Sequence, residues 1–219
     1  MKKTFVIGDI HGCYQSLVDM MKLIGDSDDT IIFLGDYVDR GPESKRVVDL
    51  VVQLKKERSC VIPLLGNHES MFLRYLNGLD RQLFLRCGGR STLESYGIDP
   101  DAENQGQIYI PDEHLVFFNS LLLNWEDEKY IYVHAGLQPG LHLSMQTDVW
   151  CLWAREEFIS SVYDFGKRVV FGHTVFAEPF LRPEKVGIDT GAVYGGNLTC
   201  LVLPDEEFIT VFGQSSNNG

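Results

Sequence analysis

The side chains best suited to chemistry in this chain are aspartate, asparagine and histidine residues that stand beside glycines. They occur in five segments, which read Gly8-Asp9-Ile10-His11-Gly12, Gly35-Asp36-Tyr37-Val38-Asp39-Arg40-Gly41, Gly66-Asn67-His68-Glu69, His134-Ala135-Gly136 and Gly172-His173-Thr174. Carboxylate, amide and imidazole groups without a thiolate favour Mn²⁺, Fe or Zn²⁺ over soft metals. Six such groups suffice for two cations if one carboxylate bridges them, namely Asp9, His11, Asp36, Asn67, His134 and His173. Two cations about 3.5–4 Å apart form the clamp that supports in-line displacement at phosphorus.

Each segment follows an apolar run that is predicted to be a buried strand. The runs cover residues 4–7, 30–34, 60–65, 130–133 and 169–171. Apolar residues at helical spacing over 14–24 and 43–56 separate the first three runs, so a βαβαβ order and a parallel sheet are expected. Ligands bind in the crevice beyond the carboxyl ends of such strands, where glycines let the backbone turn sharply. The six groups are therefore expected to meet at one edge of a sheet.

Beyond the first three strands the pattern changes. Residues 70–125 are mainly helical in pattern and are interpreted as a cap or insertion beside the sheet. Strands are expected again over 186–188, 198–203 and 208–212, with antiparallel pairing around Pro204-Asp205. The chain is thus predicted to be an α/β protein with a single domain over residues 1–213. Residues 214–219 are polar and are expected to form a disordered tail.

The composition limits the classes of partner. The 219 residues carry a formal net charge of −12, which repels phosphate backbones and argues against a nucleic-acid partner. No apolar run approaches the roughly 18–20 residues that span a bilayer, and the run after Met1-Lys2-Lys3 is too short for a secretory signal. A cytoplasmic protein with no membrane partner is expected. The five cysteines lack paired CxxC spacing, which argues against a disulfide framework or a thiolate zinc site.

The five segments, in this order, make the sequence resemble the metal-dependent phosphoprotein phosphatases, a family of calcineurin-like phosphoesterases. The motifs are GDIHG at 8–12, GDYVDRG at 35–41, GNHE at 66–69, HAG at 134–136 and GHT at 172–174. The short length, LWARE at 152–156 and IDTGAVYGGNLT at 188–199 are similar to the small bacterial and bacteriophage members. The resemblance extends over residues 5–203. It implies a calcineurin-like metallophosphoesterase fold, a β-sandwich of two mixed sheets flanked by helices.

The resemblance also implies two divalent cations and a place for each ligand. The ligands divide into Asp9 and His11 on the first cation, Asp36 between the two, and Asn67, His134 and His173 on the second. Mn²⁺ is expected to support activity in vitro, with Fe and Zn²⁺ as alternatives. A hydroxide that bridges two cations is a nucleophile near neutral pH, because metals lower the pKa of bound water toward about 7. Direct attack of this hydroxide on phosphorus is expected, without a covalent phosphoenzyme.

The remaining roles concern the leaving group and the phosphate. The resemblance implies that His68 is the general acid, oriented by Asp39, and that Arg40 and Arg155 bind phosphate oxygens, with Asn67 also in contact with the phosphate. Histidine suits this task because the alkoxide of serine or threonine leaves poorly unless it is protonated. Planar guanidinium groups suit phosphate binding, because one guanidinium can donate hydrogen bonds to two phosphate oxygens at once.

The expected reaction is hydrolysis of phosphoserine and phosphothreonine in a protein or peptide, with phosphotyrosine as a further candidate. The alternative is hydrolysis of diadenosine tetraphosphate or another dinucleotide. Such hydrolases are expected often to replace the Asp of DRG and to read GNHD, whereas this chain has Asp39 and Glu69, so the protein phosphatase is preferred. An inactive binding module is disfavoured because all six ligands are present. A nuclease is disfavoured by the net charge of −12.

Overall fold

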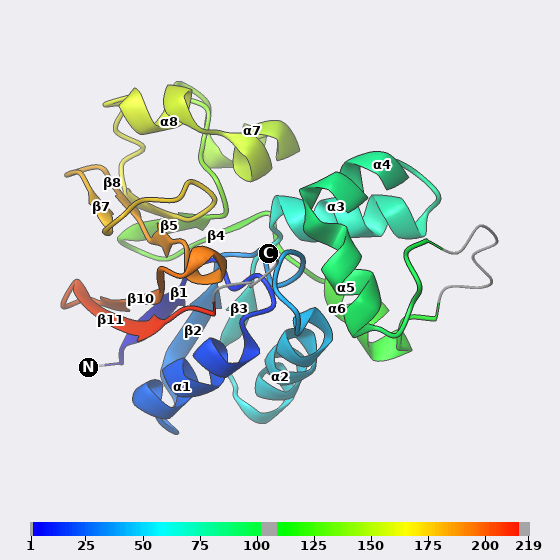
Figure 1. Ribbon diagram of the computed structural model, residues 1–219. Helices are drawn as coiled ribbons and strands as arrows, with labels where there is room; N and C mark the ends of the chain where they lie inside the picture. The colour runs from blue at the N-terminus through cyan, green and yellow to red at the C-terminus, as the bar shows by residue number, and fades with distance from the viewer. Residues whose placement is uncertain (1, 102–108, 215–219) are drawn as a thin grey trace.

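The computed structural model describes residues 2–101 and 109–214, and it arranges their strands in two sheets that pack against each other (Figure 1). The first sheet has the order β11-β10-β1-β2-β3, and a short strand β9 pairs with β10. Its strands are β1 (Thr4–Ile7), β2 (Thr30–Phe33), β3 (Val61–Pro63), β9 (Asp189–Thr190), β10 (Asn197–Leu203) and β11 (Glu207–Phe212). β1, β2 and β3 are parallel, whereas β10 runs antiparallel to β1 and to β11.

The second sheet has the order β4-β5-β6-β8-β7. Its strands are β4 (Asn124–Glu126), β5 (Tyr130–Val133), β6 (Arg168–Phe171), β7 (Phe180–Leu181) and β8 (Lys185–Gly187). β5, β6 and β8 are parallel, and the two edge strands are antiparallel to their neighbours. Both sheets are therefore mixed, and the predicted sandwich is confirmed.

Helices cover the outer faces of the sandwich (Figure 1). α1 (Tyr14–Ile24) and α2 (Ser44–Glu57) pack on the first sheet, while α7 (Asp148–Trp153) and α8 (Glu156–Ser160) pack on the second. The remaining helices stand at the side of the sandwich, and they are α3 (Asn67–Leu76), α4 (Arg81–Phe84), a π-turn (Leu85–Gly89), α5 (Arg90–Ser95) and α6 (Asp112–Asn119). Two 3₁₀ turns complete the described elements, η2 (Leu143–Met145) and η3 (Ala192–Tyr194).

β1 and β2 of the first sheet are almost entirely apolar because both of their faces are buried. Val6 and Ile32 face the second sheet, in one cluster with Tyr132 and Val170. Their neighbour Phe33 points the other way, into the cluster with α1 and α2. Alternate residues of a strand point to opposite faces, so a strand covered on both sides reads as a continuous apolar run. This is the pattern from which the strands were predicted.

The segment predicted as a helical cap differs from the structure at both ends. The first of its helices, α3, begins at Asn67 rather than at residue 70, and Asn124–Glu126 is strand β4 of the second sheet. β4 pairs with β5 in antiparallel register, which the mainly helical interpretation of residues 70–125 missed. Residues 102–108 of this segment, and residues 215–219 of the expected tail, lie outside the described residues. Among the described residues, no helix is long and apolar enough to cross a membrane.

Candidate metal centre

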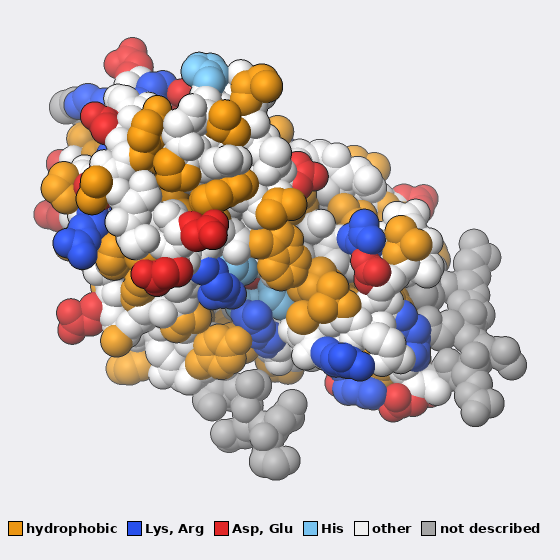
Figure 2. Space-filling model, turned by 90° about the horizontal axis from the view of Figure 1, so that it is seen from above, with side chains coloured by type: hydrophobic (Ala, Val, Ile, Leu, Met, Phe, Trp, Pro, Cys, Tyr) orange, Lys and Arg blue, Asp and Glu red, His pale blue; other side chains and the backbone are white. Residues whose placement is uncertain are grey.

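The predicted ligands lie together where the carboxyl ends of the parallel strands of both sheets meet. Asp36 follows β2, and its Oδ2 lies 3.3 Å from Nε2 of His11 while its Oδ1 lies 3.4 Å from Nε2 of His134. The same nitrogen of His134 lies 2.9 Å from Oδ1 of Asn67 and 3.2 Å from Nδ1 of His173. All five residues are buried. Figure 2 shows imidazole rings at the bottom of a hollow, beside basic side chains and with hydrophobic side chains on its margins.

The ligand atoms form two groups that share one carboxylate. His11, Asp36 and His68 offer atoms within 4.8 Å of one another, and so do Asp36, His134 and His173. Asp36 belongs to both groups and turns one oxygen toward each of them. A carboxylate placed in this way is suited to bridge two cations, which is the role that the resemblance implies for Asp36.

Backbone carbonyls fix the orientation of the imidazoles. Nδ1 of His11 lies 2.9 Å from the carbonyl of Val38, and Nδ1 of His134 lies 2.9 Å from that of Leu34. A neutral imidazole that donates from Nδ1 has its lone pair on Nε2, and metal-binding histidines are held in this way. Nε2 of His173 is buried and has no hydrogen-bond partner among the residues that the structure describes. An unpaired buried nitrogen beside inward-facing lone pairs fits a site that divalent cations complete.

The charges of the buried carboxylates also fit a cation site. Burial, together with Asp189 and Asp36, raises the pKa of Asp9 well above its usual value. Burial alone would raise the pKa of Asp36 as well, but His134, His68 and His11 hold it well below its usual range. Like charges that share a low-dielectric site repel each other unless a counter-ion separates them. The two oxygens of Asp9 accept from the peptide N–H of His173 at 3.2 and 3.1 Å.

Several site residues adopt a backbone conformation that side chains rarely take. Positive φ angles occur at His11 (45°), Asp36 (52°), Asp39 (70°), Arg40 (69°) and His173 (63°), which are five of the seven such non-glycine residues described. Each conformation of this kind costs about 1–3 kcal/mol and persists only where its surroundings enforce it. The strain is concentrated in the loops that turn ligands toward one another.

Two glycines leave the space that the carboxylates occupy. A Cβ on Gly172 would lie 2.1 Å from Oδ1 of Asp9, and a Cβ on Gly66 would lie 2.2 Å from Oδ1 of Asp36. Both distances are far inside van der Waals contact, so a side chain at either glycine would displace a carboxylate. This explains why glycine accompanies the ligands at these two strand ends.

Glu69 holds the loop that carries Asp36. Its carboxylate accepts from the backbone N–H groups of Gly66, Asp36, Tyr37 and Val38 at 2.8–3.2 Å. Burial raises the pKa of Glu69 to about 8, while the N–H donors from Val38 and Asp36 act in the opposite direction. The residue therefore joins the start of α3 to the loop after β2, and it fixes the position of the shared carboxylate.

His68 and Asp39 form the pair that the sequence predicted. Nδ1 of His68 lies 2.6 Å from Oδ2 of Asp39, which leaves Nε2 facing the cluster, 3.9 Å from Oδ2 of Asp36. Thr92 donates to the other oxygen of Asp39. Burial lowers the pKa of His68 well below its usual value, although the carboxylate of Asp36 acts in the opposite direction. Burial also raises the pKa of Asp39 to about 8.

The two predicted phosphate-binding arginines lie at different sides of the cluster. Nη1 of Arg40 contacts Nε2 of His11, so this guanidinium borders the first group of ligands. Arg155 is exposed at the start of α8, and its charge contributes to the lowered pKa of His173 in the second group. Burial is the main cause of that shift, which brings the pKa of His173 to about 2.

Asp189 was not among the site residues predicted from the sequence, yet it is buried beside Asp9 and raises the pKa of that carboxyl. Asp189 follows the apolar run Val186-Gly187-Ile188 and precedes Thr190-Gly191. It therefore repeats the signal of an acidic residue at a strand end near a glycine. Applying the rule to every predicted strand would have found it.

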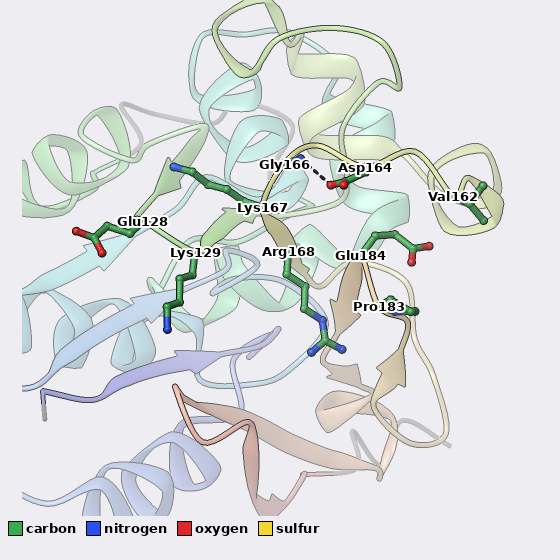
Figure 3. Close-up of a pocket in the computed structure, with 9 residues that line it drawn as sticks. All are labelled: Glu128, Lys129, Val162, Asp164, Gly166, Lys167, Arg168, Pro183 and Glu184. Carbon is green, nitrogen blue, oxygen red and sulfur yellow. Dashed lines mark hydrogen bonds between the residues drawn. The ribbon is translucent and has the colours of Figure 1, made fainter.

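A second hollow, of about 540 Å³, lies in another part of the second sheet and offers no comparable chemistry (Figure 3). Its charged side chains spread outward rather than converge on one point. Two of them are already in ion pairs, Lys167 with Glu126 at 2.6 Å and Arg168 with Glu206 at 2.5 Å. The metal centre is thus the site where chemical groups converge among the described residues.

Comparisons with known proteins agree with this geometry. The sequence profile of the calcineurin-like phosphoesterases matches residues 2–177. Bis(5'-nucleosyl)-tetraphosphatase PrpE (asymmetrical) of Oceanobacillus iheyensis is 30% identical, over 95% of this chain and 92% of the relative. The same enzyme of Bacillus mycoides is also 30% identical, over 94% and 92%.

Solved structures with the same fold include two kinds of phosphatase. A crystal structure described as that of a candidate diadenosine tetraphosphatase has a TM-score of 0.73 and 25% identity, and the match covers 100% of this chain and 95% of the other. A protein serine/threonine phosphatase from Saccharomyces cerevisiae has a TM-score of 0.67 and 17% identity, over 100% and 81%. At 17% identity, the second likeness shows the fold alone.

The predicted preference for a phosphoprotein or phosphopeptide substrate was wrong, because the full-length relatives are named as dinucleotide hydrolases. That preference rested on Asp39 and Glu69. In the structure, Glu69 accepts four backbone N–H groups and Asp39 joins His68 to Thr92, so both residues hold loops in place whatever the substrate. The profile match and the relatives establish a metallophosphoesterase hydrolase, and the chain belongs to the calcineurin-like phosphoesterase family.

Proposed function

We propose that this enzyme hydrolyses dinucleoside polyphosphates, with bis(5'-nucleosyl) tetraphosphates as the substrate class. The observation that carries the proposal is the 30% identity with the asymmetrical tetraphosphatases over 95% of this chain and 92% of the relative. In the proposed reaction, one water is added across a phosphoanhydride bond and one nucleoside monophosphate and one nucleoside triphosphate leave. Two divalent cations at the centre would supply a Lewis acid for the phosphate oxygens and lower the pKa of a water molecule.

Residues of the chain would hold the cations, bind the phosphates and protonate the leaving group. Asp36 would hold both cations, with Asp9 and His11 on one and Asn67, His134 and His173 on the other. Arg40 and Arg155 would bind phosphate oxygens from the two sides of the cluster, where guanidinium groups stabilise charge on a transferring phosphoryl group. The buried pair of His68 and Asp39, in which burial raises the pKa of Asp39 to about 8, would together supply a proton to the departing oxygen through Nε2 of His68.

A direct comparison of two substrates tests the proposal. With Mn²⁺ added, we expect kcat/KM for diadenosine tetraphosphate to exceed that for a phosphothreonine peptide by about tenfold or more, which corresponds to about 1.4 kcal/mol. Chromatography should show AMP and ATP in equal amounts, and EDTA should abolish both products. A higher kcat/KM on the peptide, or equal values on both, would contradict the proposal.

Two matched variants separate the centre from the rest of the molecule. Asp36→Asn removes the shared carboxylate charge, and we expect it to abolish hydrolysis of both substrates. Asp28→Asn makes the same chemical change at an exposed residue and should behave as the unchanged protein. Activity that survives Asp36→Asn would contradict the role of the shared carboxylate.

A further inference from the structure

Two exposed aromatic rings border the metal centre, one beside each group of ligands. Tyr194 is 60% exposed, and its ring centroid lies 5.6 Å from the guanidinium carbon of Arg40, the residue that contacts His11. Trp153 is 42% exposed, and its ring lies 6.2 Å from that of His173 at an angle of 82°. The tyrosine thus stands on the side of the first group and the tryptophan on the side of the second.

Each ring projects from a helix or turn without being part of the buried clusters. Trp153 is the last residue of α7, and the two residues before it, Cys151 and Leu152, are buried. Tyr194 ends the turn η3, which lies between Gly191 (φ 73°) and Gly195 (φ 84°), both left-handed. Large aromatic rings held in water beside a polar site lose burial free energy that the core would provide. Packing therefore does not explain why these two rings are exposed.

We propose that Tyr194 and Trp153 are stacking platforms for the nucleobases of a dinucleoside polyphosphate, an inference that rests on the proposed function. Such a substrate has a flat base at each end and a chain of phosphates between them. The site has the matching order, with an aromatic ring on each side and Arg40 and the metal ligands between them. Stacking on aromatic rings tolerates any base, since every base has a π face.

The ring of Tyr194 has a second feature that suits this task. Arg40 lies over one face at cation–π distance, and the exposed remainder of the ring is open to a ligand. One residue pair would then contact two neighbouring parts of the substrate, with the guanidinium on a phosphate and the ring on a base. A phosphopeptide offers no flat ring at a defined distance from its phosphate unless the residue is phosphotyrosine.

Leucine variants of the two rings test the inference. For Tyr194→Leu and Trp153→Leu, we expect kcat/KM on diadenosine tetraphosphate to fall about tenfold more than kcat/KM on p-nitrophenyl phosphate, which has no base. Tyr194→Phe keeps the ring and should retain the ratio of the two values. Tyr163→Leu is the matched control, because Tyr163 is as exposed as Trp153 but packs against Phe165.

A binding measurement provides a readout apart from turnover. Calorimetry with AMP and with inorganic phosphate gives a ratio of affinities that reports on the nucleoside alone. We expect both leucine variants to lower the ratio of AMP affinity to phosphate affinity, at least one of them by about tenfold. Tyr163→Leu should leave this ratio unchanged. Retained AMP preference in both leucine variants would overturn the inference.

The outcomes also distinguish this inference from the proposed function. If the unchanged enzyme prefers diadenosine tetraphosphate to the phosphothreonine peptide but neither leucine variant alters the substrate ratio, only the stacking platforms are wrong. If the unchanged enzyme prefers the peptide, the proposed function is wrong. The inference about the stacking platforms is then wrong as well, because it rests on that function.

Discussion

Single residues in this site have defined partners that assign their tasks. The pair of His68 and Asp39 is held at 2.6 Å, and Thr92 donates to the carboxylate from the other side. Nε2 of His68 is thereby directed at the cluster, where a departing oxygen would lie. A proton donor of this kind contributes about 10²–10⁴-fold in rate, and the contribution depends on how basic the leaving oxygen is.

His68→Asn should therefore have effects that differ between substrates. We expect a large loss of kcat on an alkyl phosphate, whose leaving oxygen is strongly basic, and a smaller loss on p-nitrophenyl phosphate and on diadenosine tetraphosphate. Kinetics on the three substrates under the same Mn²⁺ concentration would measure this. Equal losses on all three would show that His68 does not act as the proton donor.

Glu69→Gln should disturb the loop after β2 without removing a proposed ligand. The amide keeps one acceptor oxygen but directs an NH₂ group at backbone N–H donors, so buried groups lose their partners at about 1–3 kcal/mol each. We expect a lower Tm and weaker Mn²⁺ binding, measured by calorimetry. Glu113→Gln, at an exposed residue that pairs with Lys56, is the control and should change neither. Unchanged metal affinity in Glu69→Gln would contradict this account of the loop.

Elements position the site through a few contacts at their ends. α8 begins directly after Arg155, and its carboxyl end is held by Lys185 of β8, which is fully buried. Nζ of Lys185 donates to the carbonyls of Phe158 and Ser161, each at 2.6 Å, and lies 4.3 Å from the ring centroid of Phe158. A cation at the carboxyl end of a helix satisfies carbonyls that lack partners inside the helix. The helix that carries Arg155 is thus tied to the second sheet.

Lys185→Met keeps the length of the side chain but leaves two carbonyls without their donor. We expect a lower Tm and a higher KM for diadenosine tetraphosphate, since the start of α8 can then move. In an Arg155→Ala background, the same change should lower the Tm but leave KM unaltered, because no guanidinium remains to be displaced. Lys129→Met, at an exposed lysine, is the control. Equal effects on KM in both backgrounds would show that Lys185 acts on the site by another route.

The contact of α6 with α2 contains a histidine whose protonation depends on folding. His114 on α6 is buried, with Nε2 2.9 Å from Asp49 on α2 and Nδ1 2.9 Å from the hydroxyl of Tyr96. Burial lowers the pKa of His114 below its usual value, although Asp49 acts in the opposite direction. The unfolded chain therefore takes up a proton at a higher pH than the folded protein does. This histidine accordingly lowers stability as pH falls below about 6.5.

His114→Gln should make stability less dependent on pH. Urea unfolding at pH 7 and at pH 5 would give the loss of unfolding free energy for the variant and for the unchanged protein. We expect a smaller loss in the variant, while His142→Gln, at an exposed histidine, should lose as much as the unchanged protein. A larger loss in His114→Gln would mean that the ion pair with Asp49 outweighs burial.

At the scale of the whole molecule, the metal centre joins the two sheets. Asp36 follows β2 of the first sheet, whereas His134 and His173 follow β5 and β6 of the second. One buried cluster already packs the two sheets against each other, and the cations would add a second link between them at the carboxyl ends of the strands. A ligand that binds only the folded state stabilises it by about 2.7 kcal/mol at a hundred times its Kd.

Metal removal should therefore lower the stability of the whole domain. We expect Tm to rise with added Mn²⁺ and to return to the starting value with EDTA, followed by differential scanning calorimetry. Asp36→Asn should abolish most of the rise, and Asp28→Asn should keep it. A Tm that does not respond to Mn²⁺ in the unchanged protein would contradict a metal centre that links the sheets.

The sequence by itself determined most of the longer strands and which of the proposed ligands lie together, and the reason is local. A strand covered on both faces must be apolar, and a ligand beyond its end needs a polar side chain beside a turn, so both signals lie within a few neighbouring residues. β1, β2, β5 and β6 were predicted to within one residue at each end, and Asp9, His11, Asp36, Asn67, His134 and His173 lie together as expected. The same reasoning extends to Asp189, which was missed.

Only the tertiary structure decided the features that depend on distance between remote segments. Strand β4 was missed because an edge strand of three residues takes its character from its partner β5. The structural role of Glu69 depends on backbone N–H groups that lie more than 30 residues away in the sequence. The motif GNHE does not indicate these partners. Tyr194 and Trp153 likewise look like core residues until the fold leaves them exposed beside the metal centre. A residue's type states which contacts it can make, and the fold decides which of them it makes.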